Sequence, residues 1–297
     1  MAVASPPATK SVPSRVALRK RAGTVLYYLA VIIVVAIILF PVYWMVVSTL
    51  QPTKYSTYYP PPLFPKGANL TVFREVFDKY GVGGWILHST ILAFISTVIV
   101  LLLSIVGAYT LSSLRWRGRT VFAIFLLMTQ MLPEALIVVP IFKLFTNFPI
   151  IGVDLRNRLF GLSMLDAAFI LPIGIWVLKN LYDTIPREVQ EAARVDGASQ
   201  IRVLFQIIMP LTLPGLAAVG VIAFFYAWNE YLFAQLMISD NDLYPASVGL
   251  GFMKTMLDTP IELQLAAGLI FAIPPVFFYI VMQRYIVAGI TAGAVKG

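Results

Sequence analysis

Long apolar runs alternate with short polar segments along the whole chain. An α-helix needs about 20 apolar residues to cross the hydrocarbon core of a bilayer. Six runs approach this length, and they cover residues 26–48, 85–111, 120–144, 159–178, 212–238 and 264–285. The first is too long for the apolar region of a signal peptide, and no small-residue cleavage site follows it. The pattern therefore predicts an all-α membrane protein with six transmembrane helices.

Prolines and acidic residues interrupt two of these runs. Pro133, Glu134 and Pro140 fall within the third run, and Asp166 and Pro172 fall within the fourth. Because proline removes a helical hydrogen bond and kinks a helix, the pattern defines the boundaries of these two spans least well.

The composition supports a membrane protein and excludes several kinds of site. The chain is 59% hydrophobic and 12% charged, whereas about a quarter of the residues in a soluble domain are charged. It contains no cysteine, which excludes disulfides, thiolate metal sites and cysteine nucleophiles. A single histidine, His88, leaves no histidine-rich metal cluster. We therefore expect no metal site and no catalytic residues in this chain.

Basic residues are unevenly distributed between the two sides of the predicted spans. Of the 22 Lys and Arg residues, 14 fall on the side that holds the N-terminal tail, the 112–119 turn, the 179–211 segment and the C-terminal tail. Acidic residues favour the opposite side, by 7 to 4. By the positive-inside rule, we expect both termini and the 179–211 segment in the cytoplasm. The basic tail is then a topology signal and predicts no nucleic-acid partner.

One polar segment, EAARVDGASQ (residues 191–200), stands apart from the apolar runs. Pro186 suits the first position of a helix, and Gly197 is a natural helix stop because glycine readily adopts a positive φ. Ser199 can cap a second short helix, which we expect to end before Pro210. The segment predicts a helical hairpin outside the bilayer. By spacing alone, it could simply rest on the lipid headgroups.

The same segment resembles a known motif. Glu191-Ala192-Ala193, three residues, Gly197, nine residues and then Ile207-Ile208-Met209-Pro210 match the EAA loop of ABC importer permeases, with Met209 in place of the usual leucine. Further resemblance to the MalG-type carbohydrate permeases covers most of the chain. It is carried by the segments Thr49–Pro65, Gly107–Tyr109 with Leu114–Arg119, Thr129–Pro133, Ala227–Glu230, Gln283–Tyr285 and Thr291–Gly297.

The resemblance implies a type I ABC importer permease fold and a set of coupling residues. In that family the EAA loop forms a coupling helix that docks on a separate ATPase subunit. Carried over residue by residue, the coupling set is Glu191, Ala192, Ala193, Asp196, Gly197 and Pro210. The C-terminal tail implies a further ATPase contact at Gly293, Lys296 and Gly297, although fraying is the ordinary behaviour of a terminus.

The resemblance also implies partners, because the chain has no phosphate-binding G-x-x-x-x-G-K-[ST] motif of its own. ATP and Mg²⁺ are expected on a pair of ATPase subunits. A second related permease, giving a heterodimer, and an extracytoplasmic sugar-binding protein complete the expected importer, in a prokaryotic inner membrane. Sugar would cross by alternating access between outward-open and inward-open forms.

Polar residues within the predicted spans suggest a substrate pathway. Uncharged sugars need hydrogen bonds and aromatic surfaces rather than counter-charges. The candidates on the third and fifth spans are Gln130, Tyr226, Trp228, Asn229 and Glu230. Polar side chains also hold neighbouring membrane helices together, and the sequence leaves both roles open.

We expect three parts along the chain. These are a basic cytoplasmic tail (residues 1–25), a six-helix permease domain (26–286) with its coupling loop at about 183–210, and a cytoplasmic tail (287–297).

Four other functions remain as alternatives. An ABC permease for another solute, such as polyamines or phosphate esters, would show the same motifs. An ion-coupled secondary transporter would favour inverted repeats, and no convincing repeat is present. A membrane scaffold or receptor leaves the polar third and fifth spans unexplained. A membrane-embedded enzyme lacks the H-E-x-x-H and G-x-S-x-G motifs.

Overall fold

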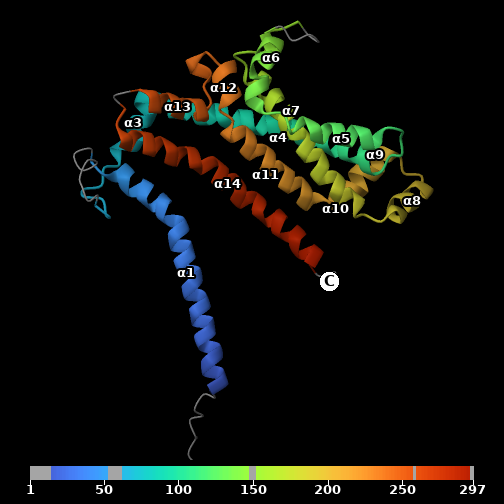
Figure 1. The fold of residues 1–297 in the computed structure, drawn as a ribbon, viewed down its shortest axis with the longest axis horizontal. Coiled ribbons are helices and arrows are strands. Elements are labelled where there is room, and N and C mark those ends of the chain that lie inside the picture. The colour runs from blue at the N-terminus through green and yellow to red at the C-terminus, as the bar shows by residue number, and fades with distance from the viewer. Residues whose placement is uncertain (1–14, 53–61, 147–151, 257–258, 295–297) are drawn as a thin grey trace, which may run out of the picture. The chain divides into compact units, whose positions relative to one another are not determined.

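The computed structural model describes residues 15–52, 62–146, 152–256 and 259–294 (Figure 1). It divides into two compact units, Met1–Asn69 and Leu70–Gly297. Helices joined by turns and short loops make up the described residues of both units, as the sequence predicts.

The first unit contains one long helix, α1 (Arg15–Leu50). Its apolar part, Gly23–Leu50, is long enough to cross a membrane. Leu63 contacts the C-terminal part of this helix, and Lys66 contacts the residue that follows it. The Tyr43 hydroxyl donates a hydrogen bond of 2.6 Å to the Leu63 carbonyl, and the Lys66 N–H donates one of 2.7 Å to the Gln51 side chain.

Four long helices form the main body of the second unit (Figure 1). They are α4 (Val82–Ser112), α7 (Leu159–Asp183), α11 (Leu213–Asn229) and α14 (Ile261–Ala294). Helix α4 packs against α7, and α11 packs against α4, α7 and α14. Small residues permit the close approach that membrane helices use. At Gly174 of α7, for example, even one added carbon would collide with Ser104 of α4.

Two further apolar stretches are sharply bent. Helices α5 (Arg119–Thr129) and α6 (Glu134–Thr146) meet at an angle of 100°, and the helical stretch Gln200–Leu211 meets α11 at 82°. By length and composition, four helices of the described part can cross a membrane, or up to six if each bent pair is one span. The third apolar run, which the sequence shows to be interrupted, breaks at residues 130–133 beside Pro133, which has no N–H to donate.

Other boundaries also differ from the prediction. The fifth apolar run is broken after Asn229, and a separate short helix, α12 (Leu232–Met237), follows. Helix α1 begins at Arg15, within the expected N-terminal tail, and α14 continues to Ala294, within the expected C-terminal tail.

The segments between spans contain helices that the pattern did not predict. These are α3 (Thr71–Tyr80), the 3₁₀ turn η2 (Asn241–Leu243) and α13 (Ala246–Thr255). His88 lies near them, and its Nδ1 is 3.2 Å from the Tyr244 carbonyl oxygen, an interaction that ties α4 to this region.

Candidate functional site

The polar segment folds into the helical hairpin that the sequence predicts. Its first arm is α8 (Arg187–Val195), and Pro186 lies just before the helix as its N-cap rather than at its first position. Gly197 ends the arm with φ = 82°. The Ala198 N–H bonds to the Ala193 carbonyl at 2.9 Å and the Gly197 N–H bonds to the Arg194 carbonyl at 3.0 Å. These two bonds form a Schellman motif, which requires the left-handed residue that glycine supplies.

The second arm begins with a capped turn. The Ser199 hydroxyl accepts a hydrogen bond of 3.3 Å from the Arg202 N–H at the start of α9 (Gln200–Val203). A π turn, η1 (Leu204–Ile208), and α10 (Met209–Leu211) follow. The expected end before Pro210 was wrong, because α10 follows the π turn without a break and the helical stretch continues through Pro210 to Leu211.

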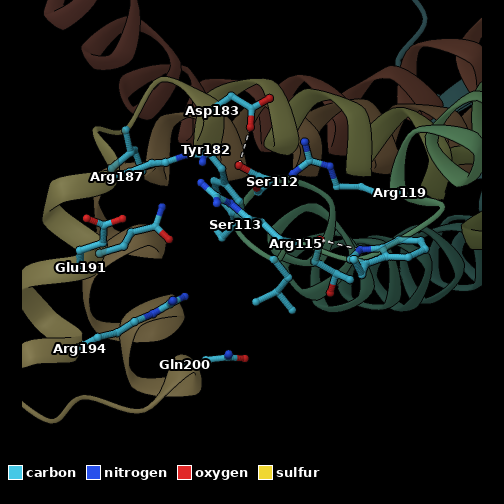
Figure 2. Close-up of a pocket in the computed structure, with 15 residues that line it drawn as sticks. Ser112, Ser113, Arg115, Arg119, Tyr182, Asp183, Arg187, Glu191, Arg194 and Gln200 are labelled. Carbon is cyan, nitrogen blue, oxygen red and sulfur yellow. Dashed lines mark hydrogen bonds between the residues drawn. The ribbon is translucent and has the colours of Figure 1, made fainter.

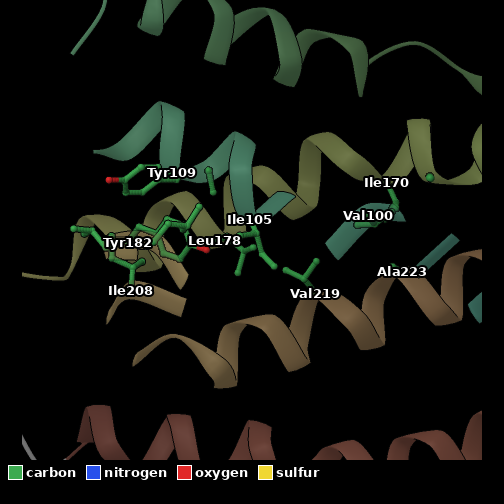
Figure 3. Packing of buried hydrophobic residues seen from close by; sticks show 13 residues of the cluster. Val100, Ile105, Tyr109, Ile170, Leu178, Tyr182, Ile208, Val219 and Ala223 are labelled. Atoms are coloured by element: carbon green, nitrogen blue, oxygen red, sulfur yellow. The ribbon is translucent and has the colours of Figure 1, made fainter. Parts of the chain in front are cut away.

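One face of the second arm is buried in the helix bundle. Val203, Leu204 and Ile208 pack in a cluster with Tyr109 of α4 and with residues of α7 (Figure 3). Val203 and Ile208 are completely buried. The hairpin is therefore anchored to two long helices through apolar contacts and will move with them.

The opposite face of the hairpin is open. Glu191, Ala192, Asp196, Gly197 and Pro210 are exposed, and Ala193 is half-buried against the cluster. Exposed apolar side chains accompany them, namely Val195 (88% exposed), Ile201 (71%) and Phe205 (43%). Among the predicted coupling residues, the structure therefore brings five to the exposed surface and one to the anchoring side.

A hollow of about 970 Å³ separates α8 from the turn between α4 and α5 (Figure 2). Four arginines line it, Arg115, Arg119, Arg187 and Arg194. They are absent from the site residues predicted from the sequence, because they belong to two segments that only the fold brings together. The signal available in the sequence was the density of arginine within 115–119 and 187–194.

The polar residues of the third and fifth apolar runs meet beside the bend between α5 and α6. The Tyr226 hydroxyl donates a hydrogen bond of 2.5 Å to Glu134, and the Gln130 amide donates one of 2.9 Å to the Phe169 carbonyl. Glu230 accepts bonds from the N–H groups of Phe233 and Ala234, at 2.6 and 2.8 Å, and so caps the start of α12. These bonds join neighbouring elements. Holding helices together is one of the two roles that the sequence left open for these polar residues, the other being contact with the substrate.

Two other pathway candidates, consecutive at the end of α11, differ in exposure. Trp228 is 1% exposed, with its ring stacked on Phe224 at 5.7 Å between centroids. Asn229 is exposed, and its amide donates a bond of 2.8 Å to the Phe225 carbonyl. Gln130 and Asn229 are thus exposed, Tyr226 is half-buried, and Trp228 lies in an aromatic cluster.

One buried carboxylate has no expected role. Asp166 of α7 is completely buried, and neither of its carboxylate oxygens has a hydrogen-bond partner among the described residues. Within the described part of the chain, no group of three His, Asp or Glu residues could hold a metal ion.

Of the C-terminal candidates, Gly293 lies in α14, whereas Lys296 and Gly297 lie outside the described residues.

Known proteins resemble this chain over nearly its whole length. The family described as "Binding-protein-dependent transport system inner membrane component" matches residues 100–292. The inner membrane ABC transporter permease YcjP of Escherichia coli is 32% identical and covers 91% of this chain and 96% of its own. The trehalose/maltose permease MalG of Thermococcus litoralis is 30% identical and covers 92% of this chain and 97% of its own.

A solved structure confirms the type of fold. A bacterial ABC transporter involved in import of the acidic polysaccharide alginate matches with a TM-score of 0.73 at 22% identity, over 93% of this chain and 99% of that one. Together with its long apolar helices, these findings identify a multi-pass inner membrane protein and a permease subunit rather than an enzyme. The chain belongs to the family of binding-protein-dependent transport system inner membrane components, the permeases of ABC transporters.

Proposed function

We propose that this chain is one of two related permease subunits of an ATP-driven importer for sugars or related polyols. It would work by alternating access with a pair of ATPase subunits, which bind ATP and Mg²⁺, and with an extracytoplasmic sugar-binding protein. The trehalose/maltose permease among the relatives supports a sugar substrate. A permease for another solute is the second candidate, because the motifs are shared across importers.

The proposed topology has six spans. The bent pair α5–α6 is counted as one span, the fifth span is kept at 212–238, and both termini and the hairpin (about 183–210) lie in the cytoplasm. The domain proposal keeps the tails at 1–25 and 287–297 and the permease domain at 26–286. The charge bias supports this orientation, with 14 of 22 basic residues on the hairpin side.

Single cysteines test the orientation, because the natural chain has none to interfere. Val195→Cys places a thiol on the hairpin and Asn241→Cys places one on η2, and both positions are exposed. In right-side-out vesicles, a membrane-impermeant maleimide should label the η2 cysteine and spare the hairpin cysteine until the membrane is opened. The reverse pattern of labelling would contradict the proposed topology.

One observation supports the coupling role most strongly. The hairpin is buried on one side against α4 and α7 and exposed on the other around Ala192. A surface of this kind can accept a rigid partner and pass its displacement to the spans. The proposed contact residues are Glu191, Ala192, Asp196, Gly197 and Pro210, with Ala193 holding α8 to the bundle. A second contact is proposed at the C-terminus, at Gly293, Lys296 and Gly297.

Enlarging Ala192 tests this surface without disturbing the fold. Because Ala192 is exposed, Ala192→Trp should leave the thermal stability of the chain unchanged but keep the ATPase subunit from docking. We expect at least a tenfold loss of ATPase co-purification and of sugar-stimulated ATP hydrolysis, since one lost contact of about 1.4 kcal/mol already changes an equilibrium tenfold. Ala192→Ser is the size-matched control. Full association of the Trp variant would refute the docking surface.

The proposed substrate pathway lies beside the break in the third span. Gln130 and Asn229 are exposed and can offer amide groups to sugar hydroxyls. The proposed set is completed by Tyr226 and Trp228, which lie on α11, and by Glu230, which follows that helix. The hydrogen bond between Tyr226 and Glu134 supports a connection between the two walls of this pathway.

A further inference from the structure

Two adjoining hollows share the same basic residues. The hollow between α8 and the α4–α5 turn has a neighbour of about 460 Å³, and Arg115, Trp116, Arg119 and Arg187 line both. No acidic residue lines the second hollow. Figure 2 shows Arg115 and Arg119 on one wall and Arg187 and Arg194 on the other. We call the residues shared by the two hollows the arginine site.

The acidic residues nearby offset only part of this charge. Asp183 already accepts hydrogen bonds of 2.6 Å from both Lys179 and Ser112. Glu191 is the other carboxylate of the larger hollow, and no salt bridge in the described part of the chain joins it to an arginine. Four arginines thus face two carboxylates in the larger hollow, and no carboxylate lines the second. This excess of positive charge favours an anion, and the planar guanidinium groups match phosphate oxygens.

An apolar surface begins at the edge of the arginine site. Trp116 is 40% exposed and its ring lies 6.0 Å from that of Phe122. Val121 (71% exposed) and Phe125 (60%) continue along α5. Tryptophan is enriched where a membrane meets water, and α5 belongs to a stretch apolar enough to enter the membrane. A ligand with a charged head and an apolar tail fits both parts, whereas free phosphate fits the first alone.

We propose that the arginine site holds the phosphate headgroup of an anionic phospholipid, with its acyl chains along the exposed side of α5. Basic pockets between membrane helices on the cytoplasmic side are a recurring means of binding such lipids. The bound headgroup bridges the α4–α5 turn to the first residue of α8. The lipid therefore holds α8 against the bundle. This inference rests on the proposed placement of the hairpin at the membrane surface.

Two arginines of one turn provide a matched test. Arg115 and Arg117 are both exposed in the α4–α5 turn, but only Arg115 lines the hollows. The complete transporter, with its ATPase subunits, is delipidated and given equal amounts of phosphatidylglycerol and phosphatidylcholine, and bound lipid is counted by native mass spectrometry. We expect Arg115→Gln to lower phosphatidylglycerol retention about fivefold, which corresponds to the ~1 kcal/mol of one arginine near an anionic surface. Arg117→Gln should retain the lipid.

Three results would overturn the lipid assignment. One is equal retention by the two variants. Another is displacement of bound phosphatidylglycerol from the wild-type transporter by inorganic phosphate as effectively as by added phosphatidylglycerol, which would indicate a site for a soluble anion. The third is loss of ATPase association in Arg115→Gln at unchanged lipid retention, which would make the site a protein contact. Lipid counting does not require sugar uptake, so a failed transport assay with normal retention would bear on the proposed function alone.

Discussion

Replacing Gly197 with valine should uncouple ATP hydrolysis from sugar uptake in the assembled transporter. Gly197 has φ = 82°, and nothing lies within 4 Å of the position that a Cβ would occupy. The effect of valine is therefore conformational rather than steric, because a left-handed conformation costs an ordinary residue about 1–2 kcal/mol. The Schellman motif loses its left-handed residue, and α8 changes its direction relative to α9. We expect uptake to fall by at least tenfold.

Gly152 provides the control for this prediction. It also has a positive φ, 61°, with no atom within 4 Å of the position that a Cβ would take, but it lies in the connection before α7. Gly152→Val should carry a similar conformational cost and leave coupling intact. Gly197→Asn should restore much of the uptake, because asparagine tolerates this conformation. Normal uptake with full ATPase association in Gly197→Val would contradict the role of the hairpin bend.

Replacing Gly249 with valine should cause a large loss of stability. Gly249 lies on α13, and a Cβ there would overlap the indole ring of Trp85 on α4. The ring is 8% exposed and rigid, so it cannot move aside as the end of a flexible side chain would. Overpacking of this kind costs about 1–3 kcal/mol or more. We expect a lower midpoint in thermal unfolding of the detergent-solubilised transporter.

Gly220 of α11 is the matched control, because a Cβ there would make ordinary contacts with Leu101 and Thr97, at 3.7 and 3.9 Å. Gly220→Ala should leave the unfolding midpoint near that of the wild type. Trp85→Phe in the Gly249→Val background should recover part of the loss, since a smaller ring leaves space. An unchanged midpoint in Gly249→Val alone would show that α13 does not pack on α4 as described.

Apolar patterning predicted the continuous spans because their only requirement is a long uncharged run. Residues 85–111 fall within α4 (Val82–Ser112), for this reason. The bend in the third run carries a proline signal, but its angle depends on how α6 packs. Helix α3 also had a signal, since Val72 and Val76 are spaced by one turn and both are buried. Helix α13 contains two glycines, and its sequence favours no helix.

The candidate site was predictable where a local residue type determines the backbone. Gly197 and Ser199 take the positions expected of a helix stop and a cap. The burial of Trp228 was not predictable, because a membrane helix is apolar on all sides and its pattern does not reveal which face meets another helix. The arginine site was hidden for a different reason, since it joins residues from distant segments.

The π turn at Leu204–Ile208 fixes how far α8 is rotated about the axis of the second arm of the hairpin. Such a turn carries about one residue more than an α turn, and each residue of a helix corresponds to a rotation of about 100°. In a homologue with one residue fewer between Ser199 and Pro210, α8 would point in a direction rotated by about 100° about the axis of this arm. The length of this arm, more than its composition, therefore sets the direction in which α8 faces.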